Sequence, residues 1–223
     1  MVGTKILLLE DDELYKNTIK EFLETENFIV KTSPDGQSFL NNIYNNIYDL
    51  YIIDINVPII NGFEILNLLK EYGDSTMKLV LTSSPSFVKN ALQKGCDDFL
   101  AKNSGIDELL LRIKSLIRRN YHCYNDIIYL DENIFYNLFE KKLYKDNAYV
   151  PLEYHSLLVL DYLIRKRDDY VPNFELEKNI YPSNSTSKSN VLRYHIWNLR
   201  KVLGKDLIKS KKSVGYKLRS LES

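Results

Sequence analysis

Residues 50–58, LYIIDINVP, join an unbroken apolar run to a carboxylate, Asp54. A uniformly apolar run of this length is typical of a strand buried on both faces, as in a parallel sheet covered by helices. Asp54 is therefore expected at the carboxyl edge of such a sheet, which is where open α/β proteins place their chemistry.

Three other apolar runs also lead into polar side chains. They are residues 6–9, followed by Glu10, Asp11 and Asp12; residues 79–81, followed by Thr82; and residues 99–101, followed by Lys102. Because neighbouring carboxylates repel one another, such a cluster needs a cation, and Mg²⁺ prefers oxygen ligands. An aspartate can also form an acyl phosphate, with Lys102 and Thr82 contacting the phosphoryl oxygens. The alternative is that these acids are helix N-caps. Capping explains any single acid more easily than it explains the whole set.

Short apolar runs alternate with amphipathic segments through the first half of the chain. This alternation predicts an α/β fold, a doubly wound five-stranded parallel sheet with helices on both faces. The predicted strands are 5–9, 28–32, 49–53, 78–82 and 98–101. The predicted helices are about 13–26, 35–46, 61–73, 85–95 and 105–119.

The second half has a different pattern, with short strands first and helices later. The strands are expected at 127–130, 134–138, 142–144 and 148–150, the helices at 153–166, 173–180 and about 188–203, and a hairpin at 207–218. Small sheets around three helices with a closing hairpin indicate an α+β winged helix-turn-helix. We therefore expect domains at 1–119 and 127–219, joined by a linker at 120–126.

Charge divides the chain in the same way. Residues 1–120 carry 13 Lys and Arg against 17 Asp and Glu, whereas residues 121–223 carry 17 against 13. From Thr186 onward there are 10 basic and 2 acidic side chains. An acidic module followed by a basic one suggests that the second meets a polyanion such as double-stranded DNA.

The helix at 188–203 shows which side chains would meet DNA. Leu192, Ile196, Leu199 and Leu203 form an apolar stripe. Amide, guanidinium and ammonium groups opposite the stripe are suited to base edges and phosphates, and lysines in the hairpin to phosphates or the minor groove. The predicted DNA-binding residues are Asn190, Arg193, Tyr194, Trp197, Asn198, Lys201, Lys209, Lys211 and Lys212. The alternative for Trp197 is an indole folded against a neighbouring side chain.

Several classes of protein are disfavoured. No apolar run approaches the roughly 18 residues of a membrane span, and the N-terminus lacks a secretory signal, so we expect a cytoplasmic protein. Cys96 and Cys123 lack metal-ligand spacing, and the three histidines are scattered along the chain. No zinc site is therefore expected.

Residues 1–119 resemble a two-component receiver domain, through the stretches KILLLEDD (5–12), DINVP (54–58), LTS (81–83) and GCDDFLAK (95–102). The resemblance implies that a partner histidine kinase phosphorylates Asp54. It also implies that Asp11, Asp54 and the Asn56 carbonyl hold Mg²⁺, with Glu10 assisting through water. Thr82 and Phe99 would form the switch that reports phosphorylation.

Residues 127–219 resemble the winged-helix effector of OmpR/PhoB-type response regulators, through VPLEY (150–154), YHIWNLRKVL (194–203) and VGYKL (214–218). A phosphorylation-promoted homodimer would then read tandem half-sites. The candidate dimer residues are Lys89, Asp97, Asp98, Arg112 and Arg118. The loop 181–189 would be the segment that touches RNA polymerase.

Some positions depart from these families. Asn103 stands where receivers usually have a cis proline, and Ser213 where effectors usually have a second glycine. The leading hypothesis is a phosphorylation-dependent transcription regulator, not an enzyme. A regulator of the same fold that works without phosphorylation is a second hypothesis. An aspartate-nucleophile phosphatase is a third, weakened because Asn56 stands where such enzymes need a second carboxylate.

Overall fold

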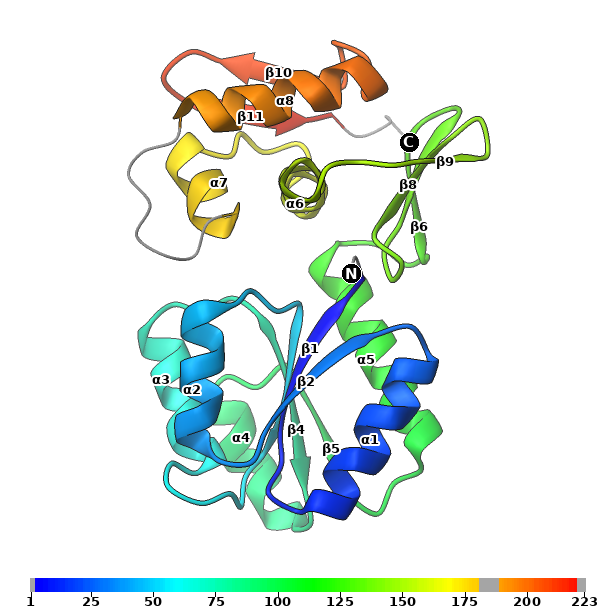
Figure 1. The fold of residues 1–223 in the computed structure, drawn as a ribbon. Coiled ribbons are helices and arrows are strands. Elements are labelled where there is room, and N and C mark those ends of the chain that lie inside the picture. Colours follow the sequence, from blue (N-terminus) through cyan, green and yellow to red (C-terminus); the bar gives the residue numbers. More distant parts are fainter. Residues whose placement is uncertain (1–2, 181–188, 220–223) are drawn as a thin grey trace. The chain divides into compact units, whose positions relative to one another are not determined.

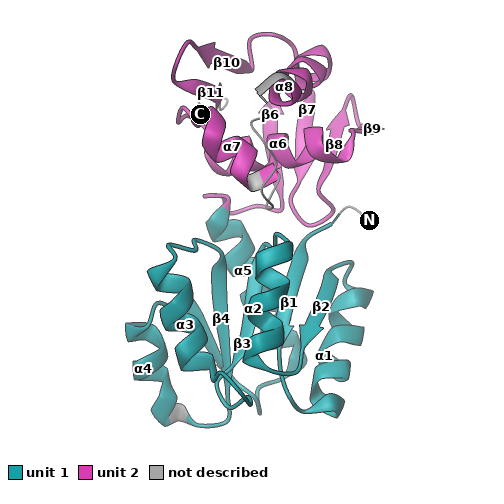
Figure 2. Cartoon of the chain, turned by 60° about the vertical axis from the view of Figure 1, so that its left-hand side comes forward, with its two compact units in different colours: residues 1, 3–120 teal, residues 2, 121–223 magenta. Residues whose placement is uncertain are grey.

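The computed structural model describes residues 3–180 and 189–219. The chain divides into two compact units, which are Gly3–Asn120 and Tyr121–Ser223 (Figure 2). In the described residues, no helix combines the length and apolar character that crossing a membrane requires.

The first unit is built on a five-stranded parallel sheet in the order β2-β1-β3-β4-β5. Its strands are β1 (Lys5–Leu9), β2 (Ile29–Ser33), β3 (Leu50–Asp54), β4 (Met77–Thr82) and β5 (Asp98–Ala101). Every residue of β3 is buried, as its apolar composition predicts for a central strand. The predicted doubly wound sheet is confirmed, and Asp54 is the last residue of its strand.

Helices cover both faces of this sheet. They are α1 (Glu13–Thr25), α2 (Gly36–Asn45), α3 (Gly62–Glu71), α4 (Val88–Gln93) and α5 (Ile106–Asn120), with a single 3-10 turn, η1 (Pro85–Phe87), before α4. In Figure 1, α2, α3 and α4 lie on one face of the sheet, and α1 and α5 lie on the other. The fourth helix is shorter than the predicted 85–95. It has no side-chain N-cap, and Gly95 in a left-handed conformation (φ 91°) ends it.

Helix N-caps account for some of the acids that follow strands. The Asp12 carboxylate accepts a hydrogen bond from the backbone N–H of Tyr15, and Asn61 forms a capping box with Glu64. Neither Asp11 nor Asp54 serves as the N-cap of a described helix. The capping alternative therefore holds for Asp12 and does not explain Asp54.

The second unit begins with a four-stranded antiparallel sheet in sequence order. Its strands are β6 (Ile127–Asp131), β7 (Ile134–Asn137), β8 (Lys142–Lys145) and β9 (Ala148–Val150). Three helices follow, which are α6 (Tyr154–Arg165), α7 (Asn173–Ile180) and α8 (Ser189–Leu203). The chain then forms an antiparallel hairpin of β10 (Ile208–Lys211) and β11 (Gly215–Leu218). This is the predicted winged arrangement.

Gly215 attaches the hairpin to the rest of the unit. Its φ is 149°, and a Cβ at this position would lie 1.9 Å from the carbonyl oxygen of Val171. The space is taken by a bridge in which Val171 and Tyr216 exchange backbone hydrogen bonds of 2.8 and 3.0 Å. Only glycine allows the two backbones to approach so closely.

A buried carboxylate, Asp161, organises the interior of the second unit. Its oxygens accept hydrogen bonds from the hydroxyls of Tyr121 and Tyr136, and it forms ion pairs with Lys141 and Arg165. Burial alone would raise the pKa of Asp161, but the two cations hold it well below its ordinary value. Tyr121 follows directly on the last residue of α5 and is 1% exposed.

Candidate functional site

Side chains from three strand ends meet at the carboxyl edge of the parallel sheet. The Lys102 ammonium lies 2.8 Å from Glu10 Oε1 and 2.8 Å from Asp54 Oδ2. Both carboxyl groups are buried, with Asp54 2% exposed and Glu10 fully enclosed. We call Glu10, Asp11, Asp54, Thr82 and Lys102 the acid pocket.

Three carboxylates of the acid pocket are close enough to share a cation. One oxygen each from Glu10, Asp11 and Asp54 lies within 4.8 Å of the others. Glu10 Oε2 is buried and has no hydrogen-bond partner among the described residues. Burial, together with the Asp54 charge, raises the pKa of Glu10 despite its hydrogen bond to Lys102. An oxygen-rich set with one unsatisfied buried oxygen fits a hard divalent cation such as Mg²⁺.

The loop after β3 is fixed closely around Asp54. The backbone N–H of Asn56 donates to Asp54 Oδ1 at 3.2 Å, and the N–H of Gly62 donates to the carbonyl of Ile55 at 3.0 Å. A Cβ on Gly62 would lie 2.4 Å from the carbonyl oxygen of Asp54. Gly62 is therefore a supporting residue of the site. The Asn-Gly pair shortly after the apolar run is the sequence signal for it.

Thr82 lies at the same sheet edge, with its hydroxyl turned to its own loop. The hydroxyl donates to the carbonyl of Ser84 and accepts from the Ser84 N–H, both at 3.1 Å. Phe99 is half-buried against the core of the sheet, opposite Val80 on β4. The structure thus places both predicted switch residues on neighbouring strands, β4 and β5.

Lys102 is held by contacts that the sequence did not reveal. The described residues contain no cis peptide bond, so the segment through Asn103 follows an ordinary trans path. The Lys102 ammonium lies 5.1 Å from the centre of the Tyr15 ring, and the Tyr15 hydroxyl donates to the Lys102 carbonyl at 3.4 Å. Burial lowers the pKa of Lys102, but hydrogen bonds to Asp54 and Glu10 outweigh burial and raise it overall. Lys102 is thus a cation at neutral pH.

The exposed face of α8 carries the side chains predicted to meet DNA. The four apolar residues of the stripe are all buried, which confirms the orientation of the helix. Tyr194 and Trp197 are 51% and 52% exposed, and the Lys201 ammonium lies 3.3 Å from the centre of the indole. Trp197 therefore packs on a residue of its own helix and remains open to solvent.

The other predicted DNA-binding residues fall on the same helix or on the hairpin. Arg193, Lys209, Lys211 and Lys212 are exposed, and Asn198 is half-buried. The side chain of Asn190 lies outside the described residues, as do residues 181–188 of the loop 181–189 that was predicted to touch RNA polymerase. His195, on the same helix, is 2% exposed and points inward.

Two of the candidate dimer residues already pair within the chain. Arg112 bonds to both oxygens of Asp98, at 3.1 and 3.0 Å, and to Glu108 at 2.7 Å. Asp97 accepts a 2.7 Å hydrogen bond from the backbone N–H of Lys78. Lys89 lies on α4 and Arg118 on α5. A dimer that used Asp98 and Arg112 would have to exchange these internal partners for partners on the second copy.

A parallel sheet with an acid pocket, joined to a basic winged helix, defines the class of DNA-binding response regulators. Residues 6–114 match the response regulator receiver domain family, and residues 147–218 match the family of C-terminal domains of transcriptional regulatory proteins. The transcriptional regulatory protein PmrA of Pectobacterium parmentieri is 30% identical, with 96% of this chain and 97% of PmrA covered. CrdR of Helicobacter pylori, also a transcriptional regulatory protein, is 30% identical, with 97% and 99% covered.

A solved structure supports the first half of this assignment. The receiver domain of the Francisella response regulator 1452 is 30% identical and superimposes with a TM-score of 0.51, covering 52% of this chain and 98% of that domain. The chain belongs to the OmpR/PhoB family of two-component response regulators, and it is a DNA-binding transcription regulator.

Proposed function

We propose that Asp54 is the phosphoacceptor of this regulator and that a sensor histidine kinase is the donor. The observation that carries the proposal is the convergence of Asp54, Glu10 and Lys102, with Lys102 within 2.8 Å of both carboxylates. An Asp54 carboxylate oxygen would attack the phosphorus of the kinase phosphohistidine, forming an O–P bond as the N–P bond breaks. The Lys102 ammonium would then pair with the new phosphoryl oxygens instead of with the free carboxylate.

The residues of the acid pocket also suit a Mg²⁺ cofactor. Asp11, Asp54 and the carbonyl of Asn56 would hold the ion, with Glu10 behind them through water. When bound, the ion neutralises charge between the carboxylates and the phosphoryl group. The buried, unpartnered Glu10 Oε2 supports this role.

We propose that phosphorylation is reported through Thr82 and Phe99. To bond a phosphoryl oxygen, the Thr82 hydroxyl must give up its two hydrogen bonds to Ser84. This movement would open space for the Phe99 ring and alter the surface of α4, β5 and α5. Dimerisation through that surface would bring two effectors to adjacent half-sites. Receiver limits of 1–119, a connection at 120–126 and an effector at 127–219 are part of the same proposal.

The direct test is to incubate the purified chain with Mg²⁺ and a small phosphodonor such as acetyl phosphate. Intact-mass measurement should show one added phosphoryl group, which Asp54→Ala loses and Asp49→Ala, a carboxylate at the other end of β3, keeps. An unchanged mass after treatment, or a phosphoryl group retained by Asp54→Ala, would reject the assignment.

The departure at Asn103 favours a second candidate function, which is DNA binding without phosphorylation. Lys102 is held by Tyr15 and followed by a trans bond at Asn103, where most receivers have a cis proline. In that case Asp54→Ala, untreated wild type and phosphodonor-treated wild type would all bind promoter DNA with the same affinity. Asp54→Ala therefore distinguishes the two candidates, because only phosphorylation-dependent regulation predicts that its DNA affinity differs from that of phosphodonor-treated wild type.

A further inference from the structure

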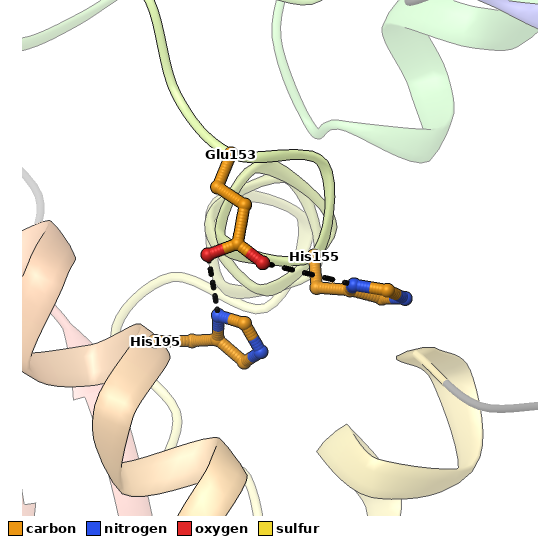
Figure 3. Close-up of side chains that lie close together, drawn as sticks. All are labelled: Glu153, His155 and His195. Atoms are coloured by element: carbon orange, nitrogen blue, oxygen red, sulfur yellow. Dashed lines mark ion pairs between the residues drawn. The ribbon is translucent and has the colours of Figure 1, made fainter.

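Two of the three histidines of the chain meet in the second unit, far from the acid pocket in sequence. His155, His195 and Glu153 each present one ligand atom within 4.8 Å of the others. The Glu153 carboxylate lies between the two rings, with Oε1 4.0 Å from His155 Nδ1 and Oε2 3.7 Å from His195 Nδ1 (Figure 3). We call these three residues the histidine cluster.

The cluster joins the start of one helix to the middle of another. Glu153 is the N-cap residue of α6, but its side chain makes no capping hydrogen bond, so its carboxylate points to the histidines instead. His155 lies in the first turn of α6, and His195 comes from α8. Packing of α6 against α8 therefore brings together residues that are 40 positions apart.

We propose that the histidine cluster binds a divalent transition metal of the zinc type. Two imidazole nitrogens and a carboxylate oxygen are a ligand set that zinc accepts, and three protein ligands leave the fourth position for water. Bonds of about 2.0–2.1 Å place tetrahedral ligand atoms about 3.3 Å apart. The 3.7 and 4.0 Å separations therefore need only a small contraction.

The exposure of two of the three ligands favours binding. The side chains of Glu153 and His155 are 50% and 38% exposed, so they can rotate toward an ion, while His195 is fixed in the core.

Binding exchanges one hydrogen bond for a metal bond. His195 Nδ1 lies 3.0 Å from the hydroxyl of Ser156, which is buried. Coordination through Nδ1 replaces this hydrogen bond, and the ring proton must then sit on Nε2. Loss of this hydrogen bond reduces the net free energy gained on metal binding. The site therefore suits a metal that binds reversibly better than a metal that is required for folding.

The position of the cluster connects metal binding with DNA recognition. The Tyr194 ring, on the exposed face of α8, packs edge-on against His195 with ring centres 5.4 Å apart. A metal between His155 and His195 would restrain α8 relative to the start of α6. The metal would thus stabilise one orientation of the helix that we predict to read bases.

The experiment measures Zn²⁺ binding to the full chain by competition with a chromogenic chelator, with Mg²⁺ in excess. Wild type should bind one Zn²⁺, and His155→Ala, at a half-exposed position, should weaken binding at least about tenfold. His122→Asn changes the remaining histidine and serves as the matched control. Equal Zn²⁺ binding by wild type and His155→Ala would overturn the proposal.

A second pair of measurements separates the histidine cluster from the acid pocket. Asp54→Asn should keep the tight Zn²⁺ site, whereas Glu153→Gln should weaken it. Zn²⁺ should raise the melting temperature of wild type and of Asp54→Asn but not that of His155→Ala. Loss of binding in Asp54→Asn with retention in His155→Ala would place the metal in the acid pocket and reject the cluster.

Discussion

At the scale of single residues, the acid pocket contains a carboxyl group, Glu10, whose charged form is unfavourable. Glu10 is fully enclosed, and its pKa is raised by burial. A carboxyl group with a raised pKa in the folded state contributes stability that is present at acid pH and is lost as pH rises through that pKa. Ionised Glu10 therefore opposes folding at neutral pH, and a bound cation would relieve this cost.

We predict that Glu10→Gln stabilises the metal-free receiver at pH 7.5. The advantage over wild type should shrink as the pH falls toward 4.5, the ordinary value for a glutamic acid. Calorimetry across this range, following the transition that Mg²⁺ shifts, measures the effect. Glu21→Gln, an exposed change on α1, is the control. A lower melting temperature for Glu10→Gln at pH 7.5 would contradict the account.

Tyr15 is a positioning residue for Lys102. Its ring lies under the Lys102 ammonium and its hydroxyl bonds the Lys102 carbonyl. We predict that Tyr15→Leu slows phosphorylation by acetyl phosphate roughly tenfold, since displacing a reacting group by about 1 Å can cost about 10²-fold. Tyr15→Phe, which keeps the ring, should slow phosphorylation less. Stopped-flow measurement of both rates checks the order; equal rates for wild type and Tyr15→Leu would remove Tyr15 from this role.

The sequence predicted where residues at strand ends would lie, but it did not predict which residues packing would bring together. Asp54, Glu10 and Lys102 follow apolar strands, so the topology alone brings them together. Tyr15 and His155 have no such marker, because Tyr15 reaches from α1 to the loop after β5, and His155 meets His195 through the packing of α6 against α8. The expectation that the histidines are scattered was correct along the chain, yet α6 and α8 bring two of them together.

At the scale of elements, the strands were predictable to within one residue because their apolar runs are short and sharply bounded. The fourth helix was not, because its length depends on capping and not on its apolar pattern. The α8 stripe was predictable, since four apolar residues at helical spacing left one orientation for the helix.

The hairpin provides a test at this scale. Ser213 adopts a left-handed conformation, with φ 62°, at a position where a glycine would be unstrained. We predict that Ser213→Gly stabilises the second unit by up to about 1 kcal/mol. Ser210→Gly, in the middle of β10, should destabilise it by a similar amount. Urea unfolding of both variants measures the two signs, and destabilisation by Ser213→Gly would contradict the assigned turn.

At the scale of the whole molecule, the second unit begins directly after the last helix of the first. Helix α5 ends at Asn120, and Tyr121, which belongs to the second unit, is buried there and bonds Asp161 of the same unit. Arg167 also bonds the backbone carbonyls of residues 121 and 122. These contacts could not be predicted from the sequence, because the partners lie about forty residues apart along the chain. The composition of 120–126 alone suggested a linker.

We propose that phosphorylation of Asp54 controls DNA binding by α8 and the hairpin. The most direct measurement is the affinity of the full chain for its own promoter DNA, at fixed salt, before and after treatment with Mg²⁺ and acetyl phosphate. We predict that treatment raises the affinity of wild type at least about tenfold and produces a dimer, and that Asp54→Ala shows neither effect. Equal gains in wild type and Asp54→Ala, or no gain in a wild type shown by mass to be phosphorylated, would contradict the account.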